Sequence, residues 1–172
     1  MEPTFHDGEL ILIDKLNYSR FLGSNHGDPI RGDVIVFRPP TELNRFYIKR
    51  IIGLPGDTVQ FRNNAITIVN KDHPQGFLLS EDYLNCDVKT ATSFQSNCSY
   101  RNVEGKSFTV PDNEYFAMGD NRDFSKDSRV CFESCSLANA TAFVERDAVV
   151  GKAWVVLWPF SQIRMNQVKV YE

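Results

Sequence analysis

One lysine stands in a mainly apolar run of residues that is rich in β-branched side chains. Lys49 lies within residues 47–53, where the alternation of side chains along a strand places it on one face with Tyr47 and Ile51 and places Arg50 on the other. Such a lysine can lay its stem along apolar neighbours and keep its charge in water. If burial removes water from the amine, its pKa falls from about 10.4, and the neutral amine becomes a general base near pH 7.

A polar loop, residues 119–129, contains side chains that would hold a neutral lysine in place. Aspartate, asparagine, serine and arginine follow one another closely in it. A serine hydroxyl can hydrogen-bond an amine and fix its direction, and Asp127 and Arg129 can brace the loop as an ion pair. A solvated loop of mixed charge has the same composition, so the loop by itself leaves both interpretations of Lys49 open.

Short strands separated by turn signals must position these groups. Pro55 and Gly56 occupy the positions that a type II turn favours, so the strand of Lys49 is predicted to fold back into residues 58–61. Asn63 and Asn64 predict the tip of a hairpin. The remaining predicted strands cover 9–14, 31–38, 107–110, 114–118 and a final strand over 152–158, with a short helix near 80–83.

The composition is that of a folded domain rich in strands. The 172 residues are 42% hydrophobic and 24% charged, with thirteen Phe and six Tyr among many Val and Ile. We predict a mainly β fold, an antiparallel, barrel-like sheet with irregular insertions. Residues 1–69 and 107–172 would form the core. Residues 70–106 would be a small, cap-like insertion that is not an independent domain, and 130–142 a second irregular one.

Charge and hydropathy narrow the class of partner. A net charge of −3 and a pI near 5.6 provide no basic surface, so nucleic acid is not an expected partner. No apolar run in the sequence reaches the 18 or so residues of a membrane-spanning helix. His6, His26 and His73 lie in polar, turn-like segments without other ligands nearby, which predicts surface histidines and no metal.

Four cysteines leave three states open. Cys86 with Cys98 would close a polar insertion, and Cys131 with Cys135 would close a short loop. Free thiols and a zinc site are the alternatives, although neither spacing is typical of zinc. Disulfides would place the domain outside the cytoplasm.

Four blocks of this sequence, in the same order, resemble the motifs of the bacterial signal (leader) peptidase I family. The members of this family are membrane-bound serine proteases with a Ser–Lys dyad. The blocks are Met1-x-Pro-Thr, Arg31-Gly-Asp-Val-Ile-Val-Phe37, Tyr47-Ile-Lys-Arg-Ile-Ile-Gly-Leu-Pro-Gly-Asp57 and Gly119-Asp-Asn-Arg-Asp-x-Ser-x-Asp-Ser-Arg129. They cover about a quarter of the chain, and the last two are long and specific.

The resemblance assigns roles to particular residues. It implies that Lys49 is the general base and that the Ser125 hydroxyl orients the lysine. The other residues of the last block would support the loop, and six apolar residues would line the substrate pockets. The supporting residues are Asp120, Asn121, Asp127 and Arg129, and the pocket residues are Met1, Phe5, Ile11, Val36, Tyr47 and Ile48.

The implied reaction is acyl transfer without a metal or organic cofactor. The substrates would be the signal peptides of exported precursor proteins, bound in an extended conformation, with small residues before the cleavage point. The catalytic domain would lie on the extracytoplasmic face of the cytoplasmic membrane, held by an anchor upstream of this sequence.

One departure from the family pattern concerns the nucleophile. The family motif begins Ser-Met-x-Pro-Thr, whereas this sequence begins at the methionine. The resemblance therefore places the nucleophilic serine one position before Met1 and predicts that the chain as given is a catalytically incomplete ectodomain. An inactive homologue that binds exported peptides, or a self-cleaving repressor-type Ser–Lys protease, are the alternatives.

Overall fold

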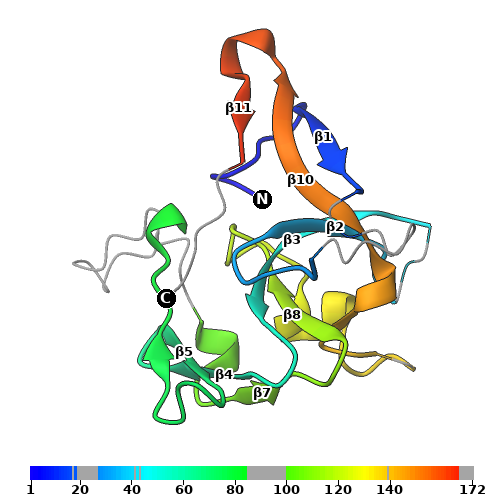
Figure 1. The fold of residues 1–172 in the computed structure, drawn as a ribbon. Coiled ribbons are helices and arrows are strands. Elements are labelled where there is room, and N and C mark those ends of the chain that lie inside the picture. Colours follow the sequence, from blue (N-terminus) through cyan, green and yellow to red (C-terminus); the bar gives the residue numbers. More distant parts are fainter. Residues whose placement is uncertain are drawn as a thin grey trace.

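In the computed structural model, antiparallel strands are the main regular secondary structure (Figure 1). It describes residues 1–16, 18, 27–40, 42, 44–84, 100–138 and 140–166. These residues form eleven strands and five short 3-10 helices, and every strand pair among them is antiparallel. The predicted mainly β fold is confirmed.

The first sheet carries the candidate site. Its strands run in the order β1-β10-β2-β3-β8-β9, and β11 pairs with β10. Figure 1 shows β10 bending away from the body of the molecule into a projecting end, where β1 and β11 flank it. The strands are β1 (Leu10–Asp14), β2 (Val34–Phe37), β3 (Tyr47–Gly53), β8 (Glu114–Met118), β9 (Val144–Glu145), β10 (Val149–Trp158) and β11 (Arg164–Met165).

The second sheet is smaller and has the order β6-β5-β4-β7. Asn63 and Asn64 form the tip between its central strands with φ of 53° and 55°, the left-handed backbone that a two-residue hairpin turn needs. The predicted hairpin is therefore present. The strands are β4 (Thr58–Arg62), β5 (Ala65–Val69), β6 (Phe77–Leu78) and β7 (Ser107–Thr109).

The turn after β3 moves the chain from one sheet to the other. Gly56 has φ +82°, and the Asp57 N–H donates to the Leu54 carbonyl at 3.0 Å, as the predicted turn requires. The next strand does not fold back on β3, however, because β4 pairs with β5 and β7. The buried Asp57 carboxylate fixes this corner: it binds Arg31 at 2.9 Å and accepts from Leu54 N–H at 2.5 Å.

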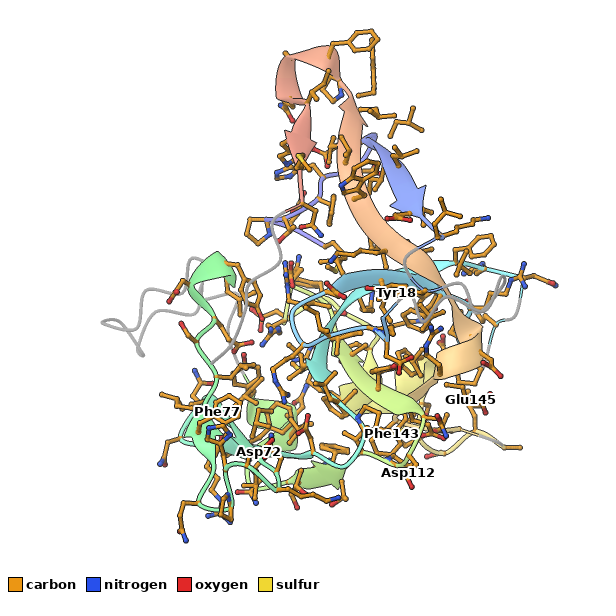
Figure 2. The ribbon with its side chains drawn as sticks, viewed as in Figure 1. Tyr18, Asp72, Phe77, Asp112, Phe143 and Glu145 are labelled. Carbon is orange, nitrogen blue, oxygen red and sulfur yellow. A yellow bond between two sulfur atoms is a disulfide. The ribbon has the colours of Figure 1, made fainter. Side chains whose placement is uncertain are left out.

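The apolar side chains of β3 divide among three clusters. Ile51 packs with Ile35 and Phe37 of β2, and Ile52 packs against the second sheet around Phe61. Phe77 and Phe143 border the cluster of Ile52 and Phe61 and are labelled in Figure 2. Because β3 belongs to the core on both of its faces, its polar side chains are held in a rigid frame.

Some predicted boundaries were wrong. β10 begins at Val149 rather than 152, and it is not the final strand, since the 3-10 helix η5 (Phe160–Gln162) and β11 follow it. The helix η5 and the strands β11 and β9 (Val144–Glu145) are too short to produce a recognisable alternation in the sequence. The helix predicted near 80–83 is η1 (Asp82–Leu84).

The two predicted insertions are only partly described. Residues 70–106 contain β6, η1 and η2 (Arg101–Val103), and 130–142 include most of η3 (Ser128–Glu133). Cys131 and Cys135 form a disulfide, whereas Cys86, Cys98 and His26 lie outside the described residues. In the described part of the chain, no helix is long and apolar enough to cross a membrane.

Candidate active site

Lys49 lies in the middle of β3, opposite Ile35 of β2. Its side chain is half-buried, and its amine donates a hydrogen bond to the Ile48 carbonyl at 3.1 Å. The nitrogen lies 5.4 Å from the centre of the Tyr47 ring, which shows that the two side chains share a face as the alternation predicted.

Burial lowers the pKa of the Lys49 amine below its usual range. The negative charges of Asp127 and Asp120 oppose this effect by attracting the ammonium form, and the positive charge of Arg129 adds to it. The net direction is the one that a general base requires, because it increases the share of neutral amine near pH 7.

Gly119 brings Lys49 and Ser125 to the same point. A Cβ on this glycine would lie 2.6 Å from the Ser125 Cβ, would overlap the Ser125 Oγ and would be 3.6 Å from the Lys49 Cδ. The Ser125 hydroxyl is buried and has no hydrogen-bond partner among the described residues. A buried hydroxyl without a partner is costly, so this oxygen is available to an amine or to a bound ligand.

Asp127 organises the loop from inside. One of its carboxylate oxygens accepts from the Arg129 N–H at 3.1 Å and from Nε at 2.9 Å. The other accepts from Arg129 Nη2 at 2.9 Å and from the Gly119 N–H at 3.0 Å. Asp127 therefore joins the two ends of the loop, which fixes Gly119 in front of Ser125.

A second ion pair ties the loop to β3. Arg50 binds Asp120 through two hydrogen bonds of 2.9 and 2.8 Å, and both side chains are almost fully buried. Arg50 also donates to the Gly32 carbonyl at 2.9 Å, and the Thr4 hydroxyl donates to Asp120. The pair therefore connects β3, the loop and the N-terminal segment.

Sequence reasoning assigned no role to Arg50 or Thr4. The signal for Arg50 was present, because an arginine on the opposite face of a buried strand needs a carboxylate partner. No local pattern identified the partner, since Asp120 is 70 residues away.

The N-terminal segment lies beside Lys49. Burial and the charge of Lys49 both lower the pKa of the Met1 amino group, and Asp120 opposes them. The Met1 carbonyl accepts from the N–H groups of Thr4 and Phe5 at 3.0 and 3.2 Å. Arg164 of β11 holds the segment from the other side through the Thr4 carbonyl at 2.7 Å.

Most of the apolar residues predicted to line substrate pockets lie together. Met1, Phe5, Ile11 and Ile48 belong to one cluster, and Val36 lies directly across from Ile48 in the adjacent strand. Tyr47 packs in a different cluster, and its hydroxyl donates to Glu42 at 3.2 Å.

Asn121 has a local role within the loop. Its side-chain oxygen accepts from the Phe124 N–H at 3.3 Å, which stabilises the turn. Within the described residues, no group of three or more His, Cys, Asp or Glu is placed to hold a metal ion.

A polar hollow of about 330 Å³ lies elsewhere, lined by Glu114, Arg146 and their neighbours, and neither Lys49 nor Ser125 borders it. Asp112 and Glu145 mark its position in Figure 2. It is therefore separate from the candidate active site.

Comparison with known proteins adds the family. The family model described as "Signal peptidase, peptidase S26" matches residues 1–158. This chain belongs to that family. The resemblance seen in the four sequence blocks is thereby confirmed, and family membership supports a peptidase.

Individual relatives agree. Signal peptidase IB of Staphylococcus aureus (strain MRSA252) is 31% identical over 96% of this chain and 77% of its own length. Signal peptidase I of Pseudomonas aeruginosa is 36% identical over 92% of this chain but only 62% of its own length, which is less than two thirds. The crystal structure of a signal peptidase I from Enterococcus faecalis V583 matches with a TM-score of 0.52 and 32% identity, over 73% of this chain and 97% of that one.

Proposed function

We propose that this chain is the catalytic domain of a signal peptidase I, an endopeptidase that removes signal peptides from exported precursor proteins with a Ser–Lys dyad. The observation that carries the proposal is the meeting of three groups. The Lys49 amine has a lowered pKa, the Ser125 hydroxyl is buried and has no hydrogen-bond partner within the described part of the chain, and the charge of Lys49 acts on the Met1 amino group.

The nucleophile in this proposal is a serine joined directly to the Met1 nitrogen in a longer form of the protein. Neutral Lys49 accepts the proton of that hydroxyl as the oxygen attacks the carbonyl carbon of the scissile peptide bond. The resulting ammonium donates its proton to the leaving amine, and an ester remains. Lys49 then takes a proton from water as the water oxygen attacks the ester carbon. The resulting ammonium returns this proton to the serine oxygen as the carbon–oxygen bond breaks, which releases the acid and restores the serine hydroxyl and the neutral amine.

The remaining residues hold this pair in place. In this mechanism the Ser125 hydroxyl would accept a hydrogen bond from the lysine amine and set its direction, while the Asp127–Arg129 ion pair keeps the loop closed. Asp120 and Arg50 align the N-terminal segment with β3 through Thr4. No metal or organic cofactor takes part in these steps.

Substrate would bind along the apolar cluster next to Lys49. An extended precursor segment with small side chains before the cleavage point fits a site whose walls are Phe5, Ile11 and Ile48. The peptide backbone would pair with neighbouring strands, and shallow apolar pockets would select small side chains.

The proposed location is the extracytoplasmic face of the cytoplasmic membrane, with an anchor upstream of Met1. Two observations support it. The Cys131–Cys135 disulfide suits an oxidising compartment. The projecting end of β1, β10 and β11 exposes large apolar side chains, among them Trp154, Trp158 and Phe160, which suit a membrane surface.

The test compares forms of the chain that carry serine or alanine directly before Met1, each preceded by a short polar segment. Cleavage of a synthetic precursor peptide is followed by mass spectrometry. The serine form is expected to cleave and the alanine form is not. In the serine form, Lys49→Ala is expected to lose about 10²–10⁴-fold in rate.

Lys126→Ala is the matched control. This lysine lies in the loop 119–129, next to Ser125, but its side chain is exposed and pairs with Glu133. It is expected to retain full activity. A serine form that binds the peptide without cutting it would indicate a binding homologue instead. Full activity in Lys49→Ala would show that the dyad assignment is wrong.

A further inference from the structure

Arg122 is a buried positive charge in the loop of Ser125. Its side chain has no exposed surface, and its Nε donates to the Gly119 carbonyl at 3.0 Å. Its own carbonyl accepts from Arg129 Nη2 at 2.6 Å. An arginine in such a position must be neutralised and fully hydrogen-bonded, because an unpaired buried charge is strongly destabilising.

The partners of Arg122 come from the segment 70–106. Glu81 binds Arg122 Nη2 at 2.5 Å, and the Tyr83 hydroxyl accepts from the same nitrogen at 2.9 Å. The Tyr100 hydroxyl accepts from Nη1 and donates to Glu81. We call Glu81, Tyr83 and Tyr100 the arginine clamp.

The clamp also contacts the second buried arginine. The Arg50 guanidinium lies over the Tyr83 ring, 4.2 Å from its centre, and the same ring is 6.0 Å from the Arg122 guanidinium. One tyrosine therefore packs beside Arg50, which ties the loop 119–129 to β3, and beside Arg122, which ties the loop to the segment 70–106.

The path from the clamp to the reacting groups is short. Arg122 fixes the Gly119 carbonyl, and Asp127 fixes the N–H of the same residue at 3.0 Å. The Cα of Gly119 is the surface against which the Ser125 hydroxyl and the Lys49 stem pack. Displacement of Gly119 would therefore loosen the packing around both side chains.

We propose that Glu81, together with Tyr83 and Tyr100, is a positioning element for the Lys49–Ser125 pair and acts through Arg122 and the Gly119 carbonyl. The segment 70–106 thus belongs to the support of the active site instead of only covering the sheet. The catalytic consequence of this inference rests on the proposed function, whereas its effect on Lys49 does not.

Glu81→Gln removes the carboxylate charge and retains the shape. The Arg122 guanidinium is then buried without a counter-charge and turns toward water, which releases Gly119. Water reaches Lys49, so its pKa rises toward the ordinary value. The groups that face Lys49 are Asp120, Asp127 and Arg129, the Met1 amino group and the Tyr47 ring, and the substitution alters none of them.

Glu104→Gln is the matched control. Glu104 lies in the same segment, and its carboxylate also binds N–H groups, those of Asn63 and Asn64 at 2.7 and 3.2 Å. It is exposed, and its carboxylate accepts from the 63–64 hairpin tip, whereas that of Glu81 binds Arg122. Tyr100→Phe is a milder second variant, which removes one hydroxyl and retains the ring among Phe61 and its neighbours.

The first measurement is the pKa of Lys49 by NMR of its ε-carbon in the chain as it is, assigned with Lys49→Arg. We expect Glu81→Gln to raise it by about 1 unit and Tyr100→Phe by less. Glu104→Gln is expected to leave it unchanged. An unchanged Lys49 pKa in both clamp variants would overturn the inference, whatever their thermal stability.

The second measurement uses the form with serine before Met1. Glu81→Gln is expected to lower kcat by about 10- to 100-fold with KM retained, because the reacting groups are misplaced while the substrate walls are intact. The rising limb of the pH–rate profile should move to higher pH, by the same amount as the pKa of Lys49. A stability defect alone would lower the amount of active enzyme without moving that limb. If the unsubstituted serine form cleaves nothing, the proposed function fails, and the NMR result still decides the clamp.

Discussion

The contact of Gly119 with the Lys49 and Ser125 side chains can be tested by adding a single methyl group. Gly119→Ala places a Cβ 2.6 Å from the Ser125 Cβ, whereas ordinary contacts are 3.4–4 Å. The φ angle of Gly119 is not in the left-handed region, so alanine meets no backbone strain there. The whole effect of the substitution therefore falls on Ser125 and on Lys49 behind it.

The magnitude follows from that distance. Ser125 must move by about 1 Å to accept the methyl group, and a misplacement of this size in a catalytic group costs about 100-fold in rate. The stability change should be smaller. Crowding costs about 1–3 kcal/mol, and the loss of glycine from the unfolded chain returns about 0.4–1 kcal/mol.

The assay is peptide cleavage by the form with serine before Met1, together with thermal unfolding. Gly27→Ala is the control, because a Cβ at that position meets no atom within 4 Å and its φ is also ordinary. Both substitutions reduce the conformational entropy of the unfolded chain by a similar amount. The difference in stability between the two variants therefore measures the contact with Ser125. We expect Gly27→Ala to retain full kcat and a melting temperature equal to or slightly above that of the unsubstituted protein.

Full activity in Gly119→Ala would refute this reasoning, because it would mean that the Ser125 position is irrelevant to the lysine. A loss of activity matched by an equal loss of folded protein would also count against it. The expected pattern is a large fall in kcat in a sample that is still folded.

Three further outcomes are expected from the structure. Lys49→Met should stabilise the protein at pH values below the lowered folded-state pKa of Lys49, because the unsubstituted protein must bury a charge there; the gain should be about 1.4 kcal/mol for each unit by which that pKa is lowered. The gain should shrink as the pH rises and vanish above about 10.4, where the amine is neutral in both the folded and the unfolded state. Urea titrations across this pH range measure it. Asp120→Asn leaves the buried Arg50 without its carboxylate and should cost about 3–5 kcal/mol in the free energy of unfolding, whereas Glu133→Gln, which breaks an exposed pair, should cause no measurable loss. Replacing Cys131 and Cys135 by serine opens a loop of five residues and should cost about 2 kcal/mol in chemical denaturation under oxidising conditions, with no difference between the proteins once the disulfide is reduced.

Features with a short-range cause were visible in the sequence. The hairpin at Asn63 and Asn64 needs left-handed backbone at two adjacent positions, and asparagine tolerates it. The turn at Gly56 has an equally local reason. β9 and β11 have only two residues each, so no alternation could have revealed them. The prediction that β4 folds back on β3 across this turn was wrong. β4 pairs with β5 and β7, because strand pairing depends on side chains that are distant in the sequence.

The alternation around Lys49 was enough to place it on one face of a strand with Tyr47. It was not enough to decide whether the amine is buried, since an exposed strand with the same residues has the same pattern. Burial depends on Gly119, which packs against the Lys49 stem from 70 residues away in the sequence, and the pKa of the amine depends also on the charges of Asp120 and Asp127 in the same loop. The sequence motifs named the family and the residues of the loop.

The sequence by itself determined the β-rich class, the turns and the identity of the groups that can do chemistry, because each of these depends on neighbouring residues. Only the tertiary structure decided that Arg50 pairs with Asp120, that Arg122 pairs with Glu81, and that the Ser125 hydroxyl is buried with no partner among the residues that the structure describes. Desolvation and ion pairing act between atoms that are close in space, and closeness in space is a property of the whole fold.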